Sequence, residues 1–321
     1  MLLASPFVGV LLALVFAVNA FAVLLTLVPG FIVVAAFVWL DRVEPEPLSE
    51  RVHAFLWGAT FAALVGSIVN DLVVVLLGYE WALVLSAPVG EEVLKGLGVL
   101  VAVRRRRLLS WFDGVVYAGF VAAGFAMVEN ALYFFDAAQT GQLPAVFIGR
   151  GLATPFAHPL FTIFTGISLG RYAVSRSPLA LLGLPIAIAL HAGWNAASLL
   201  GDLYASVLQI AAFTLFWSVL AMLVLVRVRS TRVYRGLVPL LAFRFGFDPF
   251  ELSLLTDWEA VRRARATLPK QRLPQFEALH AAALRVGRGV AADGFVPPDV
   301  VESLRIARSE FSERRLPPPV R

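Results

Sequence analysis

Ionisable and amide side chains occur inside long apolar stretches of this sequence, where such groups are unusual. They are Glu91, Glu92, Lys95, Glu129, Asn130, His158, His191 and Asn195. Carboxylates and imidazoles are common general acids and bases, and both also bind zinc. Inside a membrane, the same groups can instead link helices by hydrogen bonds or line an ion pathway. The pattern therefore predicts structural support, transport or catalysis.

The composition indicates that these groups lie in a membrane. Of the 321 residues, 59% are hydrophobic and 15% are charged, and the mean hydropathy is +0.80. Soluble domains are nearer half apolar and a quarter charged, so an integral membrane protein is indicated. The apolar runs reach about 18 residues, the length of a membrane-spanning helix, and lack the alternation of a transmembrane strand. The chain contains no cysteine, which excludes disulfides, thiolate metal sites and cysteine nucleophiles.

We expect an all-α fold, a polytopic membrane helix bundle with about eight transmembrane helices. The predicted spans are residues 3–20, 22–40, 53–78, 81–103, 113–136, 146–170, 178–200 and 205–227. Arginines occur in alternate loops, whereas the loops near 79–80, 137–145 and 201–204 hold no arginine or lysine. Because positively charged loops stay in the cytoplasm, both termini are predicted to be cytoplasmic. This indicates a multi-pass protein of the cell membrane, and the scarcity of lysine favours a GC-rich bacterial source.

The character of the sequence changes near residue 229. Residues 229–321 carry 16 Lys and Arg against 10 Asp and Glu, whereas residues 1–228 carry 11 against 12. The second part contains amphipathic patterns typical of surface helices, such as PQFEALHAAALRVGRGV and PPDVVESLRIARSEF. We therefore predict a membrane-embedded domain over 1–228 and a basic helical cytoplasmic tail over 229–321, with its last residues disordered. Solvated helix faces or anionic lipid headgroups account for this charge without nucleic acid.

The polar groups lie at similar depths on four predicted helices. At about 1.5 Å per residue, Glu91 lies roughly 18 Å from the cytoplasmic end of its span, and Glu129 roughly 24 Å. His191 lies roughly 20 Å from the cytoplasm, and His158 roughly 18 Å from the opposite side. Scattered structural links would not be expected to align in this way. We therefore predict that these side chains converge on one cavity.

Local spacing adds detail to this predicted site. Lys95 follows Glu91 by four residues and Glu92 by three, so one helix face can hold an ion pair that offsets part of the burial cost. Glu91 and Glu92 are about 100° apart around the helix, so they cannot both point at the same atom. One of them can face the reacting centre while Lys95 or a neighbouring helix holds the other. His191 and Asn195 are one turn apart and share a face, which puts Asn195 at the edge of the cavity.

Five other polar residues have simpler interpretations. Asn70 and Asp71 are interpreted as hydrogen-bonding links between helices. Arg150 is either an interface anchor or a counter-ion for the acids. His53 and His280 are expected at the surface or at a boundary, without a chemical role.

Three short motifs carry a resemblance to a known family. EEVLK at 91–95 fits E-E-x-x-K, FAMVE at 125–129 fits F-x-x-x-E, and HAGWN at 191–195 fits H-x-x-x-D/N. With His158 between the last two, this order resembles the PrsW-type intramembrane proteases, within the superfamily of CAAX-processing and bacteriocin-processing membrane endopeptidases. LDRVEPEPL, followed by AFLWGA, is similar to the loop and span that precede the family core. The resemblance covers about residues 30–227 and excludes the tail.

The resemblance implies that the protein hydrolyses a peptide bond within or beside the bilayer, in a membrane-protein substrate with a transmembrane segment. The site residues that it implies are Glu91, Glu92, Glu129, His158, His191 and Asn195, supported by Lys95 and Asn130. In a metal-free scheme, Glu91 activates water as a general base, and His191 and Asn195 donate hydrogen bonds to the oxyanion. In a metal scheme, His158, His191 and Glu129 are the ligands of a zinc ion. The residues are compatible with zinc and with no cofactor.

Two other functional classes remain open at this point. A proton-coupled secondary transporter would also place Glu, His and Lys at mid-depth, although it would usually show internal repeats, which we do not find in the sequence. A non-catalytic membrane scaffold or binding protein could use the same fold. Cleavage of membrane-segment peptides would indicate an enzyme, and ion-coupled flux into liposomes would indicate a carrier.

Overall fold

The computed structural model describes residues 20–41, 46–104, 111–175, 182–199, 244–256, 267–293 and 296–312, with a few isolated positions between 218 and 264. Across these residues the regular structure is helical, and they include no strand. The all-helical part of the predicted fold class is therefore confirmed. The chain divides into two compact units, Met1–Met222 and Leu223–Arg321.

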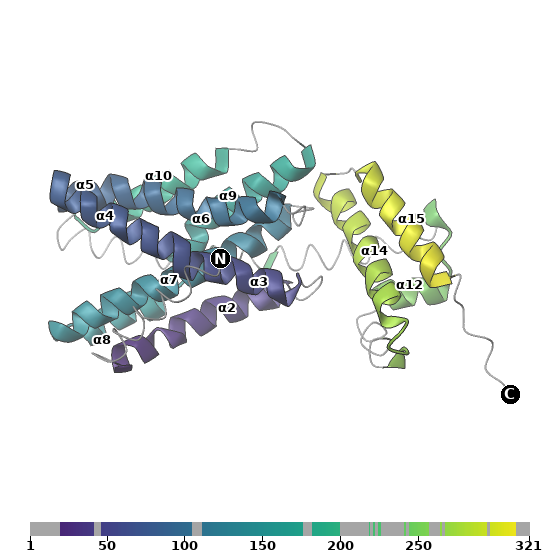
Figure 1. Cartoon of the computed structure of the whole chain (residues 1–321), viewed down its shortest axis with the longest axis horizontal. Helices are drawn as coiled ribbons and strands as arrows, with labels where there is room; N and C mark the ends of the chain where they lie inside the picture. Colours follow the sequence, from purple (N-terminus) through teal and green to yellow (C-terminus); the bar gives the residue numbers. More distant parts are fainter. Residues whose placement is uncertain are drawn as a thin grey trace. The chain divides into compact units, whose positions relative to one another are not determined.

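In the described part of the first unit, α-helices and π-helical segments follow one another closely along the chain. They are α2 (Leu27–Asp41), α3 (Leu48–Trp57), η1 (Gly58–Ala62), α4 (Ala63–Leu77), α5 (Tyr79–Trp81), η2 (Ala82–Ser86), α6 (Ala87–Arg104), α7 (Trp111–Gln139), α8 (Leu143–Val146), η3 (Phe147–Ala153), α9 (Ala157–Ser175) and α10 (Gly183–Ala197). Figure 1 shows the longer helices of this unit lying side by side as a bundle.

Four helices in the described part are long and apolar enough to cross a membrane. They are Ala20–Asp41, Leu48–Leu77, Trp111–Gln139 and Leu143–Ala173, and each overlaps a predicted span. The predicted spans 3–20 and 205–227 lie almost entirely outside the described residues. The predicted spans 81–103 and 178–200 fall on α6, which carries several charges, and on the 15-residue α10. Neither meets the same limits of length and composition, so the described residues support a membrane protein with four candidate spans and do not establish eight.

Helix α7 forms the centre of the first unit. Within its most apolar 18-residue window, 83% of the residues are buried, because α2, α3, η1, α6 and α9 all pack against it. In the corresponding window of Leu48–Leu77, only 17% are buried. The outward apolar side chains of this helix suit contact with lipid, whereas α7 is surrounded by protein.

Glycines allow α7 to approach its neighbours closely. A Cβ atom on Gly114 would lie 1.9 Å from the carbonyl oxygen of Gly166 on α9, and one on Gly166 would lie 2.2 Å from that of Gly114. A Cβ atom on Gly124 would likewise lie 2.0 Å from the carbonyl oxygen of Phe55 on α3. Since these obstacles are backbone atoms, a side-chain movement cannot relieve them. Small residues at helix crossings are a general means of association in membranes, and here they bring α7 and α9 into contact.

Gly114→Ala should therefore destabilise the bundle. The added methyl group overlaps backbone, and overpacking of this kind typically costs about 1–3 kcal/mol. The free energy of unfolding is measured by titration with sodium dodecyl sulfate in mixed micelles, followed by tryptophan fluorescence. Gly193→Ala on α10 is the matched control, because a Cβ there has no neighbour within 4 Å and alanine favours helix. Equal effects of the two substitutions would contradict the close-packing argument.

π-helical segments and one break interrupt the helices around the polar groups. Segment η2 lies just before Glu91, and η3 carries Arg150. Residues 154–156 then leave the helix, before α9 begins at Ala157. Irregular backbone at membrane depth is tolerated where protein or a cavity surrounds it, and π-helical turns are frequent at functional sites. His158 consequently lies in the first turn of α9.

The second unit is a small helical domain. It contains α12 (Pro249–Thr256), α14 (Leu273–Asp293) and α15 (Pro298–Ser312), and the two amphipathic patterns quoted above form α14 and α15. Its core is made by apolar side chains such as Phe247, Leu255, Leu279 and Leu304. His280 is only 2% exposed and stacks on Phe276, so its predicted surface position is wrong. The predicted disorder of the last residues concerns positions 313–321, which lie outside the described residues.

A capping box starts α12. The backbone N–H of Asp248 donates to Glu251 Oε2 at 3.0 Å, and the N–H of Glu251 donates to Asp248 Oδ1 at 2.8 Å. This reciprocal pair satisfies two free donors at the helix start. Arg308 of α15 then donates to Glu251 Oε2 at 2.8 Å and lies over the ring of Phe247 at 4.2 Å. One arginine thereby fastens α15 to the start of α12.

Candidate active site

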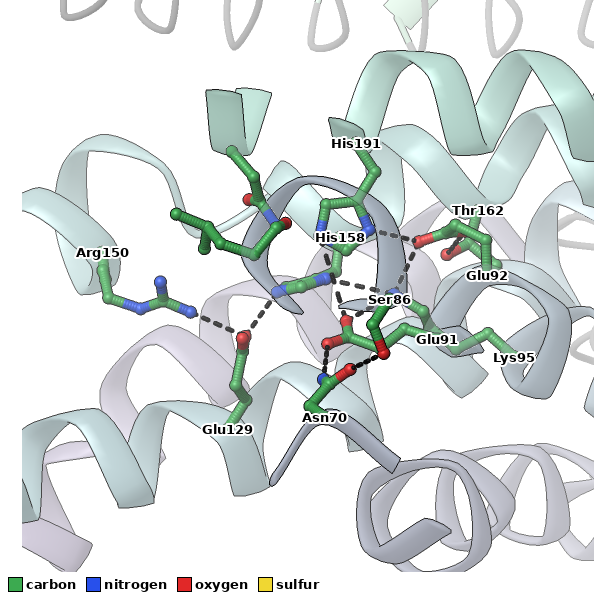
Figure 2. A network of polar contacts seen from close by, with 12 residues as sticks. Asn70, Ser86, Glu91, Glu92, Lys95, Glu129, Arg150, His158, Thr162 and His191 are labelled. Carbon is green, nitrogen blue, oxygen red and sulfur yellow. Dashed lines mark hydrogen bonds and ion pairs between the residues drawn. The ribbon is translucent and has the colours of Figure 1, made fainter. Parts of the chain in front are cut away.

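Polar side chains from several helices form one connected network inside the first unit (Figure 2). Its members are Asn70, Ser86, Glu91, Glu92, Lys95, Glu129, Arg150, His158, Thr162 and His191. They come from α4, η2, α6, α7, η3, α9 and α10. The depth argument from the sequence predicted such a meeting of helices that are distant along the chain.

Glu92 and Lys95 form a fully buried ion pair on α6. Lys95 Nζ lies 2.6 Å from Glu92 Oε1 and 3.7 Å from Glu91 Oε2, and Glu92 and Lys95 are both 0% exposed. The other oxygen of Glu92 accepts a hydrogen bond from Thr162 Oγ1 at 2.9 Å. The ammonium group also lies 4.3 Å from the centre of the Phe125 ring. The ion pairs predicted from the i+3 and i+4 spacing are thus confirmed, and Glu92 is the glutamate that Lys95 holds.

Each of the two histidines places one ring nitrogen against a carboxylate. His191 Nδ1 lies 3.2 Å from Glu92 Oε1, and His158 Nε2 lies 2.5 Å from Glu129 Oε2. A neutral imidazole carries hydrogen on one nitrogen only, so hydrogens on the carboxylate side leave lone pairs on His191 Nε2 and His158 Nδ1. Consistent with this tautomer, His158 Nδ1 lies 3.2 Å from Lys95 Nζ and can accept its hydrogen.

Glu91 is hydrogen-bonded at one oxygen only, and its other oxygen has the longer contact with Lys95 at 3.7 Å. Its Oε1 accepts a hydrogen bond from Asn70 Nδ2 at 3.1 Å, while Asn70 Oδ1 accepts one from Ser86 Oγ at 2.9 Å, which fixes the direction of the amide. Glu91 Oε2 is buried and accepts no hydrogen bond within the described residues. It lies 3.9 Å from His191 Nε2. An oxygen of this kind can serve as a ligand of a metal ion.

Arg150 is the counter-ion of Glu129. Its Nη2 lies 2.6 Å from Glu129 Oε2, and its Nε donates to Asn130 Oδ1 at 3.2 Å. The guanidinium group lies over the ring of Tyr133 at 3.8 Å. From the sequence, Arg150 was either an interface anchor or a counter-ion for the acids. Its contacts with Glu129 and Asn130 support the counter-ion interpretation. Through Glu129, this arginine also sets the position of His158.

A cavity of about 360 Å³ lies beside the network. The predicted site residues in its wall are Glu91, Glu129, Asn130, His158, His191 and Asn195. Glu92 and Lys95 are not in the wall, so Glu91 is the member of the glutamate pair that reaches the cavity. Asn195 Nδ2 donates to the backbone oxygen of Leu83 at 2.9 Å rather than to a charged group.

Three of these groups are arranged so that they could hold a metal ion. Ligand atoms of Glu91, His158 and His191 all lie within 4.8 Å of one another. Carboxylate oxygen and imidazole nitrogen are ordinary zinc ligands, and metal-bound histidines usually turn their second nitrogen to a carboxylate, as both do here. Lys95 contacts His158 Nδ1 and would have to release it. The residues fit zinc, with Glu91 in the position for which the sequence had predicted Glu129.

Four members of the network were not predicted as site residues, namely Asn70, Ser86, Arg150 and Thr162. Asn70 was interpreted as a link between helices, yet its amide binds Glu91. At about 1.5 Å per residue it lies roughly 26 Å into the predicted span 53–78, close to the depth of Glu129, so the depth argument could have found it. Ser86 and Thr162 carry no such signal, because hydroxyl side chains are common between membrane helices.

Comparison with known proteins agrees with this geometry. Residues 46–228, which are more than half of the chain and include the whole network, match the sequence profile of the PrsW family, described as intramembrane metalloproteases. The chain belongs to the PrsW family. Protease PrsW of Clostridioides difficile (strain 630) is 27% identical over 190 residues, which cover 56% of this chain and 79% of that protein. Protease PrsW of Geobacillus kaustophilus (strain HTA426) is 29% identical over 154 residues, covering 46% and 66%. No solved structure matches the chain.

Membership of the PrsW family makes this chain a membrane-embedded hydrolase that acts on peptide bonds. It favours catalysis over the carrier and scaffold alternatives for the buried polar groups. The family description also names metalloproteases, and the candidate ligands Glu91, His158 and His191 lie inside the matched region.

Proposed function

We propose that this PrsW-family protein is an intramembrane endopeptidase that cleaves a membrane-protein substrate in or near a transmembrane segment. The observation that carries the proposal is Glu91 Oε2, a buried oxygen that accepts no hydrogen bond in the described part of the chain, lies 3.9 Å from His191 Nε2 and belongs to a residue of the cavity wall. A buried carboxylate oxygen without a hydrogen-bond partner in the described part of the chain is able to take a proton from water or to bind a metal.

The surrounding residues orient the groups that would act. Asn70 fixes Glu91 Oε1 and so leaves Oε2 as the oxygen without a hydrogen bond, while Glu92 orients His191 through Nδ1. Glu129, neutralised by Arg150, orients His158 through Nε2. Such second contacts set the tautomer and the direction of a functional imidazole.

The orientation of His191 favours the metal scheme over the metal-free one. With its hydrogen toward Glu92, a neutral His191 presents a lone pair at Nε2, whereas donation to an oxyanion would require the doubly protonated ring. We propose that Glu91, His158 and His191 hold a zinc ion. When bound, zinc supplies a water of lowered pKa and polarises the scissile carbonyl.

The cavity is proposed to open in the non-cytoplasmic half of the membrane. In the helix Leu48–Leu77, in α7 and in α10, the lining residues lie in the half of each helix that ends at Leu77, Gln139 or Ala197. These ends precede the loops without lysine or arginine, which the positive-inside rule places outside the cytoplasm. We therefore propose a multi-pass cell-membrane protein with cytoplasmic termini, in which residues 1–228 carry the chemistry and the basic tail 229–321 stays in the cytoplasm.

The substrate segment must be unwound where it is cut. A hydrogen-bonded helix hides its carbonyl groups from attack, and a free extended segment would leave polar backbone in lipid. The cavity offers polar partners for such a segment, including Asn130 and Asn195 in its wall. We therefore propose that the protein acts on helices interrupted by helix-breaking residues or on segments at the bilayer surface.

Purified full-length protein should contain about one zinc per chain and cleave membrane-segment peptides. A chelator should abolish cleavage, and added zinc should restore it, because the proposed metal supplies the reactive water. His191→Ala should lose the bound zinc, measured by inductively coupled plasma mass spectrometry. His53→Ala is the control and should keep it, because His53 is neither in the network nor in the cavity wall.

The possible results separate the two schemes. Cleavage that persists in protein shown to be free of metal would exclude the zinc scheme and leave Glu91 as a general base. Failure to cleave any peptide of a broad set, by a folded and zinc-loaded protein, would contradict the protease proposal itself.

A further inference from the structure

Asp71 is a carboxylate in the wall of the active-site cavity. It lies on α4 directly after Asn70, whose amide binds Glu91 Oε1 at 3.1 Å. The Asp71 side chain is exposed, and it makes no hydrogen bond or ion pair with any residue that the structure describes. The sequence interpretation of Asp71 as a link between helices is therefore not supported by any contact in the described part.

The other charged groups of the wall already have partners. Glu129 is paired with Arg150 at 2.6 Å, and Glu91 lies 3.7 Å from Lys95. Among the described wall residues, Arg150 is the only cation, and it also contacts Asn130 and the ring of Tyr133. Asp71 is thus the wall carboxylate that has no cation within ion-pair distance among the described residues.

Filling the cavity would change the surroundings of this charge. In the empty cavity, water can hydrate Asp71, whereas a bound peptide displaces that water. An apolar side chain opposite Asp71 would leave the carboxylate desolvated without a partner, which is unfavourable. A lysine or arginine side chain would instead form a charge-assisted hydrogen bond with it.

We propose that Asp71 forms a subsite that binds a lysine or arginine side chain of the substrate. The proposal rests on the protease function proposed above, because it requires the peptide to lie in this cavity. Neighbouring helix positions point about 100° apart, so Asp71 faces a different part of the cavity from the Asn70 amide that holds Glu91. The basic side chain would therefore lie away from the reacting carbonyl group, to one side of the scissile bond.

The test uses full-length, zinc-loaded protein and a synthetic peptide library. All peptides share one apolar membrane segment and carry six randomised residues on its non-cytoplasmic side, and products are sequenced by mass spectrometry. The measured quantity is the ratio of kcat/KM for peptides with lysine or arginine at a given position to that for peptides with norleucine there. The wild type should show a ratio of about five at one position, as expected for a partly hydrated ion pair.

Two substitutions at Asp71 test the charge itself. Asp71→Asn should reduce the ratio to about one, and Asp71→Lys should transfer the preference to glutamate at the same position. Glu80→Gln is the matched control, because Glu80 is an exposed acid on the neighbouring α5 that is not in the wall, and it should keep the wild-type ratio. A wild type that cleaves the library without a basic preference, or a preference unchanged in Asp71→Asn, would overturn the subsite alone. A wild type that cleaves no peptide would instead count against the proposed function.

Discussion

Glu91→Gln should lower kcat/KM for peptide cleavage by about 10³-fold or more. Glutamine keeps the shape of the side chain and its contact with Asn70, but the amide can neither take a proton from water nor bind zinc strongly. The loss is expected in both schemes, because Glu91 Oε2 accepts no hydrogen bond from the described residues and lies 3.9 Å from His191 Nε2. Initial rates on a membrane-segment peptide, together with zinc content and size-exclusion profile, measure the effect.

The control for this substitution is Glu80→Gln, which removes an exposed carboxylate outside the cavity wall. Its kcat/KM should stay within about twofold of the wild type, since exposed surface changes have small effects. If folded Glu91→Gln protein kept an activity within tenfold of the wild type, Glu91 would have no essential role in the reaction. The buried polar groups would then be interpreted as structural links between helices.

Lys95→Met should lower the free energy of unfolding by about 3–5 kcal/mol. Methionine has a similar length but no charge, so Glu92 would be left as a buried carboxylate without its cation, which lies at 2.6 Å in the wild type. Removal of one partner of a buried ion pair is costly because the remaining charge stays desolvated. Titration with sodium dodecyl sulfate measures the change in the first unit.

The double variant Lys95→Met/Glu92→Gln separates charge from packing. Neutralising the stranded carboxylate should recover a large part of the lost stability, whereas a pure packing defect would remain. Arg305→Met, measured on the unfolding of the second unit in which it lies, offers a comparison at the same i, i+3 spacing, because its pair with Glu302 is exposed, with side chains at 68% and 61%. That change should stay below about 0.5 kcal/mol, and an equally small effect of Lys95→Met would contradict the role of the buried pair.

The membrane setting and the approximate site could be predicted without coordinates. Charged groups inside apolar helices are rare and have to face protein, so their depth along each helix is informative. The estimated depth along the predicted spans put Glu91, Glu129, His158 and His191 at similar levels in the membrane. The structure places all four in the wall of one cavity. The i+3 and i+4 spacing similarly predicted the contacts of Lys95 with Glu92 and Glu91.

The direction in which a side chain points cannot be predicted from α-helical spacing where the helices are irregular. Segments η1, η2 and η3 have π-helical hydrogen bonding, which changes the number of residues per turn. Positions after such a segment are rotated relative to a regular α-helix, so the sequence could not show which of Glu91 and Glu92 faces the cavity. For the same reason, Ser86 in η2 could not be assigned to Asn70 from spacing.

Apolar length and the cost of charge in lipid depend on local composition, so the amino-acid sequence alone indicates a helical membrane protein and puts Glu91, Glu129, His158 and His191 at similar depths. Tertiary structure decided the partners: Arg150 binds Glu129, Asn70 binds Glu91, and Glu91 joins the two histidines as a possible metal ligand. Those contacts depend on how each helix is rotated and how closely it approaches its neighbours, which the glycine crossings and π-helical segments set only in the folded bundle.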